Sequence, residues 1–107
     1  MLNYSIDFDY EKKYLEILKN IILFKCKDTN CKIFLFGSRA RQKYRRDSDY
    51  DIGFENIDKK TFLKLKWDIE IEIEESIVPH SIDLINFDEA DNNFKKYALK
   101  DIIVWKN

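Results

Sequence analysis

The sequence predicts an α/β (α+β) fold, in which a small mixed β-sheet is covered by helices. Segments with apolar residues at helical spacing alternate with short apolar runs of strand length. The chain has 107 residues, enough for one small core and too few for two. It contains only two Gly and one Pro, so no flexible linker divides it. We therefore expect residues 1–107 to form a single domain.

The first helix and the first strand are predicted from the N-terminal third of the chain. Residues 10–27 have polar residues on one side of a helix and an apolar stripe on the other. The stripe consists of Tyr14, Ile17, Leu18, Ile21 and Phe24. Residues 32–36 are apolar on both faces, which is typical of a central strand covered on both sides. After this strand, Ser38 is predicted to cap a short helix.

The middle of the chain is predicted to form a second strand and a long helix. Residues 50–55 place Asp51 and Gly53 on one face of a strand and apolar residues on the other. Residues 58–76 are ambiguous, because residues 69–74 alternate like a strand while the segment also fits a helical stripe of Phe62, Leu65, Ile69, Ile73 and Ile77. The length without Gly or Pro favours a helix, which leaves Trp67 and Ile71 exposed and is ended by Pro79.

The C-terminal part is predicted to add a third strand, a last helix and a closing strand. Residues 81–87 form the strand, and Asp88 is expected to cap a helix that runs to about residue 100. Its inward residues are expected to be Ala90, Phe94, Tyr97 and Ala98. Residues 102–105 are expected to close the sheet.

Charge and cysteine content limit the classes of function. The net charge of −1 argues against direct nucleic-acid binding through bulk electrostatics. No apolar stretch approaches the ~18 residues that a membrane span needs. Cys26 and Cys31 do not have CxxC spacing, and we interpret them as reduced thiols of a cytoplasmic protein.

The most informative motif is Gly37-Ser38, followed after ten residues by Asp49-Tyr50-Asp51. A glycine turn between a strand and a helix start can hold a phosphate on its backbone N–H groups. Alternate strand residues point the same way, so the two carboxylates would lie about 6–7 Å apart along the backbone. Such a pair suits Mg²⁺, which takes a few acidic oxygens together with substrate phosphates.

A third carboxylate is expected from Asp83, the only acid in an otherwise apolar predicted strand. A buried charge is costly unless it is paired or binds metal, so Asp83 is predicted to complete a metal site and to help accept a proton. Between the two halves of the motif lies a basic cluster. Of its members, Arg39 and Arg41 are the ones we expect to contact a triphosphate or a partner.

These residues carry a family resemblance. The stretches Leu35-Phe36-Gly37-Ser38-Arg39-Ala40-Arg41 and Ser48-Asp49-Tyr50-Asp51-Ile52, with the later Asp83, resemble the DNA-polymerase-beta-like nucleotidyltransferase superfamily. The chain is most similar to its minimal members, the MNT antitoxins that are paired with HEPN toxins. Two departures stand out, since many relatives have Gly in place of Gln42 and Pro in place of Arg46.

The resemblance implies a polymerase-beta-like nucleotidyltransferase fold and a concrete activity. Such proteins use ATP and Mg²⁺, with two ions expected, to transfer AMP to a tyrosine of a HEPN ribonuclease, with which they form a hetero-oligomer. Gly37 and Ser38 match the phosphate-binding pair, and Asp49, Asp51 and Asp83 match the metal-binding catalytic triad.

Two alternatives remain open. The exposed Trp67 and Ile71 suit an antitoxin that neutralises its partner by complex formation without catalysis. A nucleotidyltransferase with a small-molecule acceptor is less favoured, because a chain of 107 residues leaves no room for an acceptor-binding domain.

Overall fold

The computed structural model describes residues 8–45 and 48–107. The elements are α1 (Phe8–Lys25), β1 (Lys32–Phe36), α2 (Gly37–Ala40), β2 (Tyr50–Glu55), α3 (Lys59–Glu74), β3 (Ile82–Asn86), a 3₁₀ turn (Phe87–Glu89), α4 (Asn92–Ala98) and β4 (Ile103–Lys106). The predicted bounds of β1 and β2 are confirmed to the residue. Within the described ranges, no helix is both long and apolar enough to span a bilayer.

The four strands form one mixed sheet in the order β3-β2-β1-β4. β1 pairs antiparallel with both β2 and β4, whereas β2 and β3 run parallel. Parallel neighbours need a crossover connection, and α3 supplies it between β2 and β3. The predicted mixed sheet is confirmed, and β3 and β4 are its two edges.

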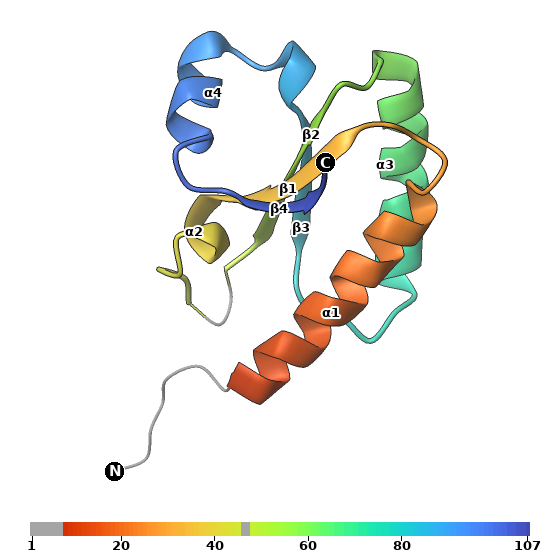
Figure 1. The fold of residues 1–107 in the computed structure, drawn as a ribbon. Coiled ribbons are helices and arrows are strands. Elements are labelled where there is room, and N and C mark those ends of the chain that lie inside the picture. The colour runs from red at the N-terminus through yellow and green to blue at the C-terminus, as the bar shows by residue number, and fades with distance from the viewer. Residues whose placement is uncertain (1–7, 46–47) are drawn as a thin grey trace.

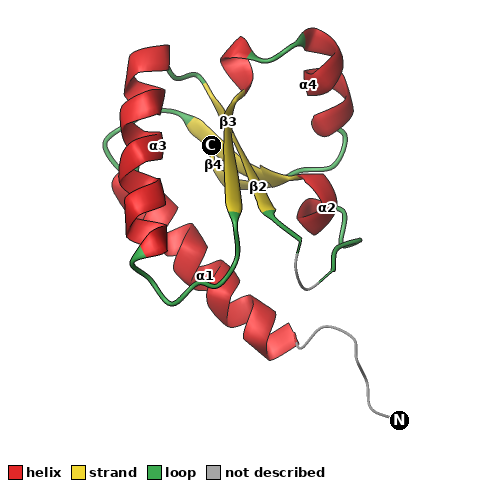
Figure 2. Cartoon of the chain, turned by 180° about the vertical axis from the view of Figure 1, so that it is seen from behind, coloured by secondary structure: helices red, strands yellow, loops and turns green. Residues whose placement is uncertain are grey.

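Helices cover the sheet on both faces (Figure 1). α1 and α3 lie on one face, and the short helices α2 and α4 lie on the other, as the view from behind also shows (Figure 2). Ile33 and Leu35 of β1 point into the larger core on the α1 and α3 side, while Phe34 and Phe36 point into a smaller cluster with Phe87. The prediction of a central strand covered on both sides is confirmed.

The buried face of α1 differs from the predicted stripe. Leu18, Ile22 and Cys26, spaced four residues apart, are fully buried, whereas Phe24 is 63% exposed with the Lys27 ammonium over its ring. The expectation for Phe24 was wrong because α1 carries apolar residues on several sides, and tertiary packing decides which of them is covered. Both cysteines are free and buried.

The helical interpretation of the ambiguous middle segment is confirmed by α3. Its N-terminus is capped by the Asp58 carboxylate, which accepts a hydrogen bond from the Thr61 N–H at 2.8 Å. Trp67 and Ile71 are exposed, as predicted, but Ile77 lies beyond the helix and is 62% exposed. The helix ends at Glu74, well before Pro79, and the Ser76 hydroxyl donates to the carbonyl of Ile73. Pro79 therefore does not terminate it.

The last helix is shorter than predicted and has a different cap. The Asp91 carboxylate accepts from the N–H groups of Asn93 and Phe94, so Asp91 caps α4. Asp88 instead accepts from the Ile57 N–H at 2.8 Å and joins the 3₁₀ turn to the loop after β2. Of the four residues that were expected to face inward, only Ala98 is buried, and Tyr97 is 65% exposed.

Candidate active site

The turn after β1 is shaped by a close approach to β2. Gly37 has φ +76°, a conformation that favours glycine, and a Cβ atom there would overlap the carboxylate of Asp51. Glycine is therefore required at this position for two independent reasons. α2 begins at Gly37 itself with Phe36 as its N-cap residue, so Ser38 lies inside the helix and is not the cap that was predicted.

The three predicted carboxylates belong to neighbouring segments at the start of the parallel strand pair. Asp51 and Asp83 are direct register partners on β2 and β3, so their side chains share a face of the sheet. Asp49 immediately precedes β2. Asp51 is half-buried, whereas Asp49 and Asp83 are exposed. The expectation that Asp83 is buried was wrong, because β3 is an edge strand and its outer side is open to solvent.

Asp51 is the electrostatic centre of this group. Burial raises the pKa of its carboxyl group to about 6, the neighbouring charges of Asp83 and Asp49 add to that rise, and Arg41 opposes it. A carboxylate at Asp51, disfavoured by burial and by two neighbouring acids, would be stabilised by a cation. Within the described parts of the chain, however, no three such side chains lie close enough together to hold a metal ion as they stand.

A cavity of about 330 Å³ lies beside Asp51, between α2 and α4. Its lining residues are Phe36, Gly37, Ser38, Arg41, Asp51, Phe94, Tyr97 and Ala98. The structure therefore brings the turn at Gly37 and Ser38, the Asp51 carboxylate and Arg41 together around one cavity. Sequence reasoning placed Phe94 and Tyr97 in the core, but both line this cavity with partly exposed rings, a surface on which a nucleobase can stack.

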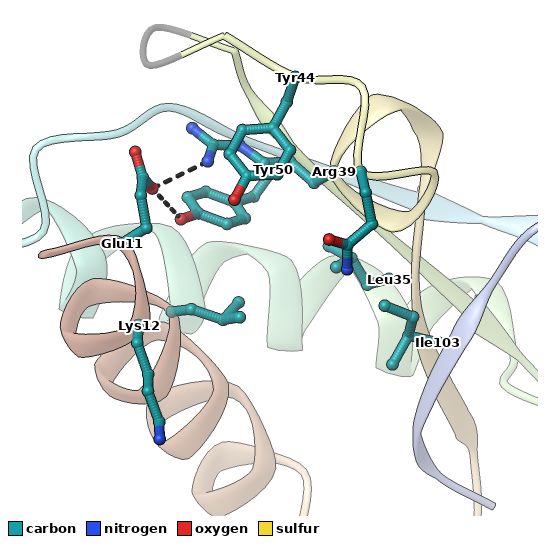
Figure 3. Close-up of a pocket in the computed structure, with 9 residues that line it drawn as sticks. Glu11, Lys12, Leu35, Arg39, Tyr44, Tyr50 and Ile103 are labelled. Carbon is teal, nitrogen blue, oxygen red and sulfur yellow. Dashed lines mark hydrogen bonds and ion pairs between the residues drawn. The ribbon is translucent and has the colours of Figure 1, made fainter. Parts of the chain in front are cut away.

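Arg39, which was expected to bind nucleotide, is placed elsewhere. Its side chain is buried, and Nη1 donates to Glu11 Oε2 at 2.9 Å in an ion pair (Figure 3). Its guanidinium carbon lies 4.2 Å from the ring centroids of both Tyr44 and Tyr50. These residues border a different cavity, of about 260 Å³. Arg39 does not line the cavity beside Asp51.

Arg39, Glu11 and Tyr50 form a cluster that connects three segments of the chain. Nη2 of Arg39 donates to the carbonyl of Ser48 at 2.9 Å, one residue before Asp49. The Tyr50 hydroxyl, between the two aspartates in sequence, donates to Glu11 Oε2 at 3.1 Å. α1, α2 and the start of β2 are thereby held together by buried polar contacts. Nothing in the sequence singled out Glu11, because its partner lies 28 positions away.

His80, the only histidine of the sequence, belongs to the same cluster. Its Nε2 lies 3.8 Å from Glu11 Oε2, and its ring packs edge-on against Tyr50. Burial lowers the pKa of His80, with Glu11 opposing and Arg39 reinforcing that shift. The neutral imidazole is therefore favoured.

The loop between α2 and β2 contains the two departures from the family pattern. Gln42, where many relatives have Gly, has φ +62°, in the left-handed region that glycine adopts more easily. Arg46 lies outside the described residues.

Comparison with known proteins identifies the class. The model of the polymerase beta nucleotidyltransferase family matches residues 12–107, and this chain belongs to that family. A search of curated proteins finds no match.

Solved structures share the fold. A chain of a toxin–antitoxin complex with AMP-PNP is 19% identical, with a TM-score of 0.59, over 81% of this chain and 71% of that one. A chain of the complex of tri-AMPylated HEPN toxin with MNT antitoxin from Shewanella oneidensis is 17% identical, with a TM-score of 0.57, over 84% and 70% of the two chains. A chain of a mutant MntA–HpeT toxin–antitoxin complex is 17% identical, with a TM-score of 0.59, over 81% of this chain and 71% of that one. These similarities confirm the predicted nucleotidyltransferase fold.

Proposed function

We propose that this protein is a cytoplasmic MNT-type antitoxin that transfers AMP from ATP to a tyrosine of a HEPN ribonuclease and thereby inactivates it. Membership of the nucleotidyltransferase family supports the reaction class. The fold likeness to chains of toxin–antitoxin complexes, one with an AMPylated HEPN toxin and one with AMP-PNP, supports the acceptor and the nucleotide.

The residues have separate roles in this proposal. Asp49, Asp51 and Asp83 hold Mg²⁺, since their oxygen donors suit a hard cation, and burial together with the neighbouring charges of Asp83 and Asp49 raises the pKa of Asp51. Bound Mg²⁺ would neutralise phosphate charge. The turn at Gly37 and Ser38 receives the triphosphate, and the adjacent Arg41 adds positive charge. Two Mg²⁺ ions are expected.

The transfer step balances without any further reactant. The tyrosine oxygen of the acceptor forms a bond to the α-phosphorus of ATP, while the bond from that phosphorus to the oxygen bridging to the β-phosphate breaks. Pyrophosphate leaves, and Asp83 accepts or helps to accept the phenolic proton.

The observation that carries the proposal is the arrangement around Asp51. Gly37 contacts its carboxylate from one side, and Asp83 lies beside it in strand register. Asp83 lies on the open edge of the sheet, where a protein surface can reach it. This arrangement supports a site that combines a phosphate-binding turn, acidic metal ligands and an accessible acceptor side.

The decisive experiment uses the folded partner protein, which we expect to be encoded by the gene next to the one for this chain. Incubation with ATP and Mg²⁺ should add the mass of one or more AMP groups to that partner, measured by intact mass spectrometry. The Asp49→Asn/Asp51→Asn variant is the matched control and should leave the mass unchanged. An unmodified, folded partner after incubation with the wild-type chain would refute the proposed transfer.

Neutralisation by complex formation alone is the second candidate, favoured by the exposed Trp67 and Ile71 on α3. The same double variant separates the two functions in cells. Loss of protection supports AMP transfer, and full protection by the variant supports sequestration.

The aromatic wall of the cavity gives a further check on nucleotide binding. Replacing Tyr97 by Ala should raise the KM for ATP about tenfold, because stacking on an aromatic ring contributes about 1–3 kcal/mol per base. Tyr97→Phe keeps the ring and should leave the KM nearly unchanged. Equal KM values for the two variants would exclude a stacking role.

A further inference from the structure

The outer face of α3 is a continuous apolar stripe. Leu63, Trp67 and Ile71 follow one another at intervals of four residues and are 51%, 67% and 41% exposed. This spacing places them on one side of the helix. The buried residues of α3 (Phe62, Leu65, Ile69 and Ile73) lie on the side that packs against α1 and the sheet.

The charges of α3 are segregated along its length. The N-terminal half carries Lys59, Lys60, Lys64 and Lys66, and the C-terminal half carries Asp68, Glu70, Glu72, Glu74 and Glu75, which is its C-cap. This order opposes the helix dipole, which favours acids in the first turn and bases in the last, and α3 has neither. The pattern therefore weakens the isolated helix and needs another explanation.

The pattern is antisymmetric about Trp67. Leu63 lies four residues before Trp67, and Ile71 lies four residues after it. Likewise, each lysine on the outer face has an acid at the same distance on the other side. These pairs are Lys60 with Glu74 and Lys64 with Glu70.

Some of the charged residues of α3 already form ion pairs within the chain. Lys66 pairs with Glu70 at 3.1 Å, and Glu72 pairs with Lys25 of α1 at 3.2 Å. For Lys60, Lys64 and Glu74, by contrast, no ion pair is seen in the part of the chain that the structure describes. These charges remain available to a partner.

We propose that this surface binds a second copy of the chain, with the two α3 helices antiparallel and Trp67 at the twofold axis. A twofold interface brings each residue of a pair against its counterpart in the other copy, so Leu63 meets Ile71 and Lys60 meets Glu74. A parallel arrangement would instead place lysines against lysines. An unrelated partner would not require this self-complementarity.

The proposed dimer is compatible with the candidate active site and does not depend on its activity. α3 covers the sheet face opposite α2 and α4, which border the cavity beside Asp51 (Figure 1). Both sites therefore stay open in the dimer. A contact between single helices is small, so we expect concentration-dependent association rather than a permanent dimer.

Charge reversal provides a sharp test by sedimentation velocity from about 10 µM to about 1 mM, a range that suits weak interfaces. The wild-type chain should shift from monomer towards dimer. Lys60→Glu/Lys64→Glu and Glu70→Lys/Glu74→Lys should each weaken self-association at least about tenfold, because like charges would oppose one another. An equimolar mixture of the two variants should associate again as a heterodimer.

The charge-reversal variants are chosen so that misfolding does not explain a loss of association. The outermost changes, at Lys60 and Glu74, place charges where the helix dipole favours them, so the variants should fold, and circular dichroism checks this. Lys96→Glu/Lys100→Glu, on and after α4, is the matched control and should associate like the wild type. A wild-type chain that stays monomeric throughout, or a mixture that fails to associate, would overturn the proposal. A foreign protein that binds α3 of a monomeric chain would count against it equally.

Discussion

Removing Arg39 tests whether its buried ion pair stabilises the fold. The variant Arg39→Met keeps the length of the side chain but leaves the Glu11 carboxylate in the interior without the guanidinium that contacts it at 2.9 Å. The ion-paired side chains are only 2% and 6% exposed, so solvent cannot screen the remaining charge. Loss of one partner of a buried pair typically costs about 3–5 kcal/mol.

That cost is a large share of the stability of a small domain, which is about 5–15 kcal/mol in total. Equilibrium urea unfolding should show the midpoint falling by about 2 M, given a denaturant dependence of about 2 kcal/mol per M. The loss should shrink at lower pH, where protonation of the nearby His80 places a positive charge 3.8 Å from the Glu11 carboxylate.

The double variant Glu11→Leu/Arg39→Met is the internal control. Replacing both charges by apolar groups should cost at least about 2 kcal/mol less than the sum of the single changes, because no buried charge remains. Strictly additive losses, or a loss below about 1 kcal/mol for Arg39→Met, would refute the reasoning.

Three further predictions concern the site and its loop. Gln42→Gly should raise the free energy of unfolding by about 0.5 kcal/mol, because glycine adopts the left-handed backbone conformation without strain. Asn56→Gly, at the same φ of +62°, should raise it less, because Asn tolerates this region. Urea unfolding measures both variants. Gly37→Ala should abolish AMP transfer in the mass assay, because the methyl group displaces the Asp51 carboxylate, whereas Ser38→Ala should retain measurable activity. Because the pKa of Asp51 is raised to about 6, the metal-free wild-type chain should become more stable as pH falls from 8 towards 4. For the same reason, the Asp51→Asn variant should be more stable than the wild type at pH 7. Thermal unfolding measures both chains across this range, and the same pH dependence for both would contradict the prediction.

The central strands and the phosphate turn could be predicted from sequence because local signals define them. β1 is an apolar run that ends at Gly37, and β2 follows the polar loop, so both bounds were correct. The close contact between Gly37 and Asp51 then follows from antiparallel pairing of neighbouring strands, which the order of elements favours.

Features that depend on distant partners could not be predicted in the same way. The position of β3 at the sheet edge, which exposes Asp83, is set by strand order and not by its own residues. Arg39 lies beside the phosphate turn in sequence, yet its side chain pairs with Glu11 on another helix. Tyr97 fits a helical stripe, but α4 has only seven residues and leaves its ring at the surface.

The sheet separates two halves of the molecule, a thick one with a large buried cluster and a thin one with a small cluster. The buried cluster on the α4 side consists of Phe34, Phe36, Phe87 and Ala98, against the much larger cluster beneath α1 and α3. Segments with few buried apolar contacts open locally at a free energy below that of global unfolding. α4, which forms one wall of the cavity beside Asp51, belongs to the thin half. The thicker half therefore fixes the strands that carry the acids, while the α4 wall of the cavity can adapt at low energetic cost.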